Sequence, residues 1–102
     1  MNYQVIYTDG FLDDVREHLS YLRREKVAEH VIENWYTKLF DRLDGLDFWP
    51  RTFPVSESYS RDVGRTTHKY NVGDYLVFYH IDDKHQRVEL TAFFNGAKNW
   101  KK

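Results

Sequence analysis

Hydrophobic and polar positions recur with two different periods along this 102-residue chain, and the period separates helical from extended segments. Residues 2–8 alternate at every second position, which predicts a short strand with β-favouring side chains on both faces. From residue 11 to residue 24, apolar side chains recur every three or four positions, which predicts an amphipathic helix. The same spacing predicts a second helix over residues 27–47. The connection is so short that we expect an antiparallel helix hairpin.

Two prolines, Pro50 and Pro54, end the helical pattern within an irregular stretch over residues 47–60. From Arg65 onward the period falls to two, and polar turns divide the rest of the chain. The pattern predicts three strands, over residues 65–71, 75–81 and 87–94. In the last of them, simple alternation places Val88, Leu90, Ala92 and Phe94 on one face and Arg87, Glu89, Thr91 and Phe93 on the other.

These elements predict an α+β fold. An N-terminal strand and an antiparallel helix hairpin would pack on an antiparallel sheet of about four strands. The length and the 41% hydrophobic content fit one domain over residues 1–102. Alternation alone does not decide which face of the sheet the helices cover, so both assignments stay open.

The composition excludes several classes of function. The chain has no cysteine, which rules out disulfides, a thiolate zinc site and a cysteine nucleophile, and we expect no metal or other cofactor. The first ten residues lack the basic start and apolar run of a secretion signal. No stretch approaches the roughly 20 apolar residues that cross a bilayer. We therefore expect a cytoplasmic protein.

Charge is unevenly distributed, although the formal net charge is only −1. Residues 1–50 hold six Lys/Arg against ten Asp/Glu, whereas residues 51–102 hold nine against six. The difference has two interpretations: ordinary solvated faces, or a C-terminal half that meets an acidic partner. The pI of about 6.5 argues against a chain whose main role is to bind polyanions.

The order of elements resembles the RelE/ParE superfamily of type II toxin–antitoxin toxins. The opening YQVIYTDGFLDDVREHLSYL is similar to the family's first strand and helix, and Arg65 leads a segment that resembles its second strand. The strand YLVFYHI, which ends in the acidic turn Asp82-Asp83, resembles the family's recurrent Tyr-rich strand. The segment from Asn95 to Trp100 is similar to the ending of ParE-like members.

The resemblance implies a toxin that inhibits growth, stabilises plasmids and is neutralised by a cognate antitoxin, ParD-like or of another kind. ParE-like members poison DNA gyrase without being enzymes, whereas RelE-like members cleave mRNA on the ribosome. The low pI and the lack of Tyr or His after His85 favour the ParE-like branch. The alternatives are a ribosome-dependent mRNA endonuclease and an inactive module that only binds the antitoxin.

A nuclease would need an acid or base near the 2′-hydroxyl and cations at the phosphate. The residues that suit this chemistry are Arg65, His68, Lys69 and Arg87, with His80 as a second candidate acid or base. The alternative for each is an ordinary strand residue, packed or outward-facing. For the antitoxin, we expect an apolar contact surface that comprises Leu76, Phe78, Phe93 and Trp100.

Overall fold

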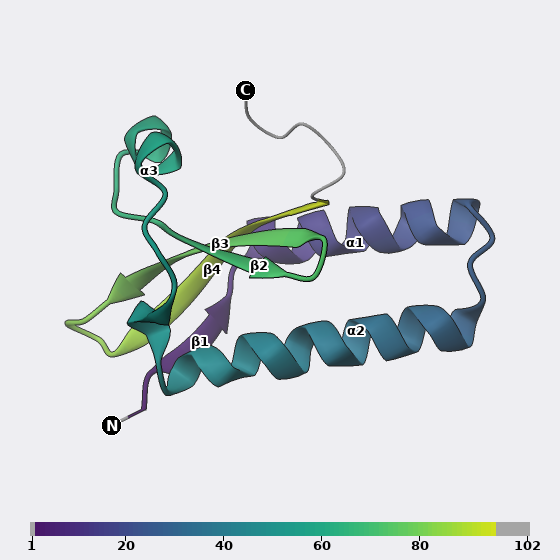
Figure 1. The fold of residues 1–102 in the computed structure, drawn as a ribbon, viewed down its shortest axis with the longest axis horizontal. Helices are drawn as coiled ribbons and strands as arrows, with labels where there is room; N and C mark the ends of the chain where they lie inside the picture. Colours follow the sequence, from purple (N-terminus) through teal and green to yellow (C-terminus); the bar gives the residue numbers. More distant parts are fainter. Residues whose placement is uncertain (1, 96–102) are drawn as a thin grey trace.

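The computed structural model describes residues 2–95, which form a four-stranded sheet with the helix hairpin α1–α2 on one side (Figure 1). A short third helix, α3, lies near the other side of the sheet. The elements in chain order are β1 (Gln4–Tyr7), α1 (Asp9–Arg24), α2 (Glu29–Asp44), η1 (Gly45–Asp47), η2 (Pro50–Thr52), α3 (Glu57–Val63), β2 (His68–Val72), β3 (Tyr75–Asp82) and β4 (Arg87–Asn95). The predicted α+β fold is confirmed.

The strands lie in the order β1-β4-β3-β2. Strands β2, β3 and β4 form the expected antiparallel meander. Strand β1, however, pairs parallel to β4, so the sheet is mixed and not wholly antiparallel as predicted. The prediction failed here because a period of two describes a strand equally well in either direction.

The helix hairpin follows the predicted pattern closely. Helix α1 ends at Arg24 as expected, and a tight turn in which Lys26 adopts a φ of 61° leads to α2. Helix α2 is shorter than predicted, and η1 completes the segment to residue 47. Thr8 Oγ1 accepts a hydrogen bond from the Phe11 N–H and donates one to the Leu90 carbonyl, which fixes the start of α1 against β4.

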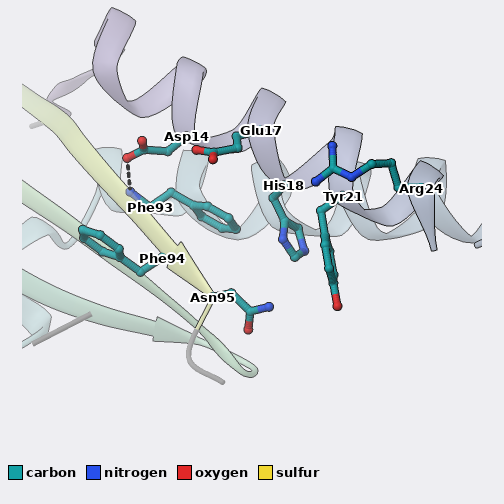
Figure 2. Close-up of a pocket in the computed structure, with 8 residues that line it drawn as sticks. All are labelled: Asp14, Glu17, His18, Tyr21, Arg24, Phe93, Phe94 and Asn95. Carbon is teal, nitrogen blue, oxygen red and sulfur yellow. Dashed lines mark hydrogen bonds between the residues drawn. The ribbon is translucent and has the colours of Figure 1, made fainter. Parts of the chain in front are cut away.

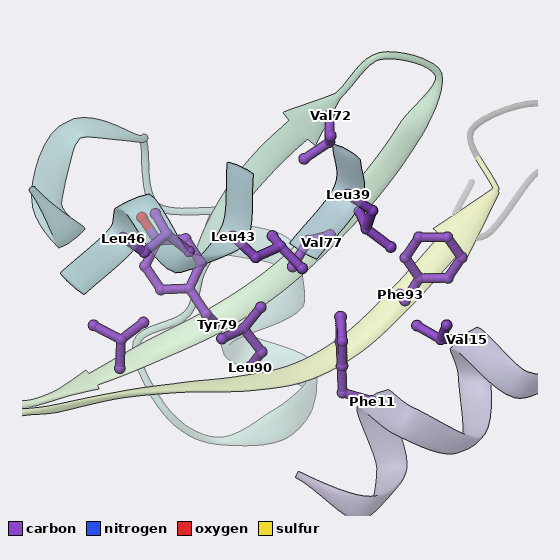
Figure 3. Packing of buried hydrophobic residues seen from close by; sticks show 11 residues of the cluster. Phe11, Val15, Leu39, Leu43, Leu46, Val72, Val77, Tyr79, Leu90 and Phe93 are labelled. Atoms are coloured by element: carbon purple, nitrogen blue, oxygen red, sulfur yellow. The ribbon is translucent and has the colours of Figure 1, made fainter. Parts of the chain in front are cut away.

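The main core lies between the helix hairpin and the sheet (Figure 3). Phe11 is fully buried and meets Tyr7, Phe40 and Phe93 at ring-centroid distances between 5.8 and 6.3 Å. A second, smaller cluster lies on the opposite face of the sheet, where Tyr59 of α3 packs over it. The sheet is therefore buried over part of both faces.

Helix α3 lies in the stretch that we expected to be irregular up to residue 60. Ser56 Oγ accepts a hydrogen bond from the Tyr59 N–H at the start of the helix. Gly64 closes it with a φ of 80°, a left-handed conformation that favours glycine. The Ser56–Gly64 spacing was a usable signal for a short helix. Because a turn follows α3, strand β2 begins at His68 and not at Arg65 as predicted.

A β-bulge interrupts the β3–β4 ladder. Phe78 pairs with Ala92, and the next residue, Tyr79, pairs with Leu90, so Thr91 is the extra residue in β4. Val88, Leu90 and Phe93 consequently all point into the main core, while Ala92 lies in the second cluster with Phe94 packed against it. The predicted alternation along β4 is wrong after Leu90, because it assumed an unbroken period of two.

Among residues 2–95, no helix is both long and apolar enough to cross a membrane.

We predict that Phe11→Ala lowers the free energy of unfolding by about 4 kcal/mol, because it removes a fully buried ring from the centre of the core. Urea denaturation monitored by tryptophan fluorescence measures the loss. Val31→Ala is the matched control, since Val31 is 48% exposed, and should change stability by less than about 0.5 kcal/mol. Equal losses in the two variants would contradict the packing described.

We also predict that Tyr79→Phe destabilises the fold by about 1–2 kcal/mol, because a buried acceptor loses its donor. The Tyr79 hydroxyl donates to the Pro50 carbonyl and so holds η2 against the sheet. The same denaturation assay, run beside Tyr36→Phe at a 41% exposed position, isolates the effect. A Tyr79→Phe variant as stable as the wild type would show that this hydrogen bond contributes nothing net.

Candidate functional site

The face of the sheet away from α1 and α2, here the outer face, carries most of the polar chemistry of the strands. Side chains alternate across a strand, and the bulge resets the alternation in β4. The outer face therefore presents Lys69, Asn71, Leu76, Phe78, His80, Asp82, Arg87, Glu89, Ala92 and Phe94. Its apolar end lies near α3, and its polar end lies near the β3–β4 turn.

His68 does not lie on the outer face. It is only 9% exposed, and its ring stacks on Tyr79 with centroids 5.2 Å apart. Its Nδ1 donates to the Phe53 carbonyl at 2.8 Å, because a carbonyl can only accept. Of the two interpretations open at the sequence level, the structure supports a packed histidine with a satisfied ring nitrogen.

The three cationic candidates are dispersed. Arg65 is exposed in the turn after α3, and its backbone N–H donates to the Ser60 carbonyl. Lys69 is half-buried on β2. Arg87 lies at the start of β4, where its guanidinium is 3.2 Å from Asp82 and 3.5 Å from Glu89. The charge of Arg87 is thus balanced by two carboxylates, which leaves little attraction for a phosphate.

A histidine–carboxylate pair that the sequence pattern did not reveal lies at the polar end of the outer face. His80 is 4% exposed, and its Nε2 lies 2.5 Å from Glu89 Oε1. Asp82 continues the cluster, because it contacts both His85 and Arg87. The hydrogen bond from His85, with smaller help from Arg87, lowers the pKa of Asp82 to about 2. The hairpin register pairs His80 with Glu89 and Asp82 with Arg87, so a correct register would have revealed the cluster.

The expected antitoxin-binding residues do not share one surface. Leu76 and Phe78 lie on the outer face, but Tyr59 of α3 stacks on Phe78 with centroids 3.9 Å apart, and Phe78 is fully buried. Phe93 lies on the opposite face, within the main core and 4% exposed. The expectation that Phe93 joins Leu76 and Phe78 is therefore wrong, and the bulge is the reason. Trp100 lies outside the described residues.

A hollow of about 160 Å³ separates α1 from the end of β4 (Figure 2). Asp14 accepts a hydrogen bond from the Phe93 N–H at 3.1 Å at one end of it, and burial raises the pKa of this carboxyl. His18 lies in its wall, with Nε2 3.2 Å from the Tyr75 hydroxyl. Two carboxylates, Asp14 and Glu17, against one cation, Arg24, make the hollow unsuitable for a phosphate.

Within residues 2–95, no group of three His, Asp or Glu side chains is placed to hold a metal ion.

Comparison with known proteins agrees with this architecture. A family model described as ParE toxin of type II toxin–antitoxin system, parDE, matches residues 5–100. The crystal structure of the toxin–antitoxin complex RelBE2 from Mycobacterium tuberculosis contains a similar fold. Its TM-score is 0.55 at 20% sequence identity, over 93% of this chain and 99% of that one. A comparison with curated proteins gave no match.

The family match spans nearly all of the described residues, from within β1 to the end of β4. This chain belongs to the ParE toxin family of type II toxin–antitoxin systems.

Proposed function

We propose that this protein inhibits growth by acting on DNA gyrase without being an enzyme, and that a cognate antitoxin neutralises it. The observation that carries the proposal is the dispersion of the four nuclease candidates. His68 packs on the hairpin side of the sheet, whereas Lys69 and Arg87 belong to the outer face and Arg65 lies in an exposed turn. Acid–base catalysis on RNA needs these groups around one phosphate.

The charge balance supports the same conclusion. Affinity for the ribosome would come largely from contacts to phosphates, which require cations that are free to make them. At the polar end of the outer face, Arg87 is occupied by Asp82 and Glu89, and Arg51 is paired with Asp83 of the β3–β4 turn. Binding to a protein target does not require free cations on the surface, because apolar and polar contacts can supply the affinity.

The second candidate is a ribosome-dependent mRNA endonuclease, and one observation favours it. His80 and Glu89 form a carboxylate-oriented histidine of the kind that acid–base catalysts use. Arg87 contacts Glu89 of this pair. Lys69 on β2 lies beside Phe78, which is two residues before His80 on β3. An inactive module that only binds the antitoxin is the third candidate, and a growth assay separates it from the other two.

The antitoxin has a suitable surface on the helix hairpin. A groove of about 310 Å³ runs between α1 and α2, with Leu19 and Ile32 on its floor and Tyr36 on its rim. Tyr36 is 41% exposed, and Val31 nearby on α2 is 48% exposed. The apolar floor of the groove suits the apolar face of a partner helix, and Arg23, Glu33 and Thr37 add polar groups to its lining. We propose that the antitoxin covers this groove.

We predict that the purified protein inhibits supercoiling by DNA gyrase and does not cleave mRNA in a translating extract. The two assays should run side by side with the wild type and the His80→Asn/Arg87→Ala variant. The variant should retain gyrase inhibition within about threefold, because neither group is assigned a catalytic role. Lys84→Ala, an exposed change in the β3–β4 turn, is the control.

Cleavage by the wild type that this double variant loses would overturn the proposal in favour of the nuclease. Normal growth after induced expression of the wild type without antitoxin would establish the inactive module instead.

We further predict that Tyr36→Asp weakens antitoxin binding on the order of 30-fold, the loss expected for a tyrosine at the centre of an interface. Calorimetry with the antitoxin encoded beside this gene measures the affinity. Growth inhibition by the variant should stay at the wild-type level, while rescue by co-expressed antitoxin should fail. Asn34→Asp adds the same charge at another exposed position of α2 and should have little effect. Equal affinity of the wild type and Tyr36→Asp would exclude the groove.

A further inference from the structure

Strand β2 is one of the two edge strands of the sheet, and only the first part of its free edge is covered. Residues 54–56 run beside it. The Ser56 N–H donates to the Thr67 carbonyl at 2.9 Å, and the Lys69 N–H donates to the Pro54 carbonyl at 2.8 Å. Residues 50–52 then turn away as η2. The covering segment therefore ends before it reaches Asn71.

The backbone of Asn71 points outward at this uncovered edge. Because the Lys69 N–H is directed away from β3, the N–H and carbonyl of Asn71, two residues on, have the same direction. Asn71 is exposed, and within residues 2–95 no hydrogen bond from another element reaches its backbone. Gly73 follows, and a Cβ added there would meet no described atom within 4 Å, so the turn next to Asn71 leaves open space.

A slot of about 180 Å³ lies beside this edge, between α2 and the β2–β3 turn. Its floor is apolar, because Leu39 and Val72 are almost fully buried there. Trp35 and Tyr75 form an aromatic wall with ring centroids 5.2 Å apart. The slot is thus built to accept a side chain with an apolar stem.

The rim of the slot is cationic. Lys38 and Arg42 are four residues apart on α2, so both side chains lie on the face that borders the slot. Both residues are exposed, and in the described part of the chain neither forms an ion pair. One carboxylate, Asp74, lies in the adjoining turn. Two cations against one carboxylate leave a positive excess for a ligand.

We infer that the free edge of β2 at Asn71 and the adjoining slot bind an extended acidic segment of the partner protein, which adds a short strand to the sheet. The residue that pairs with Asn71 directs its side chain to the outer face, and the neighbour that lies beside Val72 directs its side chain toward the slot. A glutamate neighbour would lay its methylenes on Leu39 and Val72 and its carboxylate between Lys38 and Arg42. The identity of this partner as the antitoxin rests on the proposed function.

The test is an NMR titration of the ¹⁵N-labelled protein with the peptide acetyl-Thr-Glu-Thr-Leu-Thr-amide. Shifts should concentrate at the Asn71 and Gly73 amides and at the Trp35 indole, with a Kd on the order of 1 mM for so short a ligand. The control peptide, acetyl-Thr-Lys-Thr-Leu-Thr-amide, differs only in the sign of one charge and should bind at least about 10-fold more weakly.

Three variants locate the binding. Lys38→Glu/Arg42→Glu should abolish the shifts, whereas Arg61→Glu/Lys84→Glu changes the net charge equally at distant exposed sites and should preserve them. Asn71→Pro removes the outward N–H without breaking the β2–β3 ladder and should weaken binding at least about fivefold. The spectra of the free variants show directly whether each one is folded.

Absence of shifts at millimolar peptide, shifts elsewhere on the surface, or equal binding of the lysine peptide would each overturn the inference. So would a wild-type dimer that Asn71→Pro converts to a monomer, because a second copy would then occupy the edge. The titration is independent of growth inhibition, so a failure of the proposed function and a failure of this inference give different results.

Discussion

One extra residue in the middle of β4 controls how both faces of this protein are used. Thr91 bulges out of the ladder, and its hydroxyl donates to the Phe78 carbonyl. On one side of the bulge, Val88 and Leu90 face the helix hairpin. On the other side Phe93 does so too, and Asp14 holds it there by accepting its backbone N–H. Strand β4 also lies between β1 and β3, so a bulge in it affects the strands on both sides.

The bulge also separates two chemical environments on the outer face. Before the bulge in β4, Arg87 pairs with Asp82 and Glu89 pairs with His80 across the hairpin. After the bulge, Ala92 and Phe94 join the apolar cluster under α3. The charged side chains in these ion pairs and the aromatic rings in this cluster already contact one another, so they are less available to contact a ligand. The outer face is therefore largely committed to internal contacts, which is the physical basis for placing partner contacts elsewhere.

The two surfaces to which we assign partner contacts are both on α2. One is the groove that α2 shares with α1, and the other is the slot that it shares with the edge of β2. A domain of this length buries only about two-thirds of its unfolded surface, so a partner that covers α2 would add appreciably to its stability. A helix in the groove and a strand at the edge can be supplied by one chain, because they make different kinds of contact.

The sequence by itself determined which segments are helical and which are extended, because a period of three to four or of two is a local property of side chains. The helix hairpin and the β2–β3–β4 meander were predictable for this reason. Only the tertiary structure decided that β1 runs parallel to β4, that Thr91 shifts Phe93 into the core, and that Tyr59 covers Phe78. Strand direction, bulges and cross-strand partners depend on contacts between residues far apart in the chain, to which a local period is insensitive.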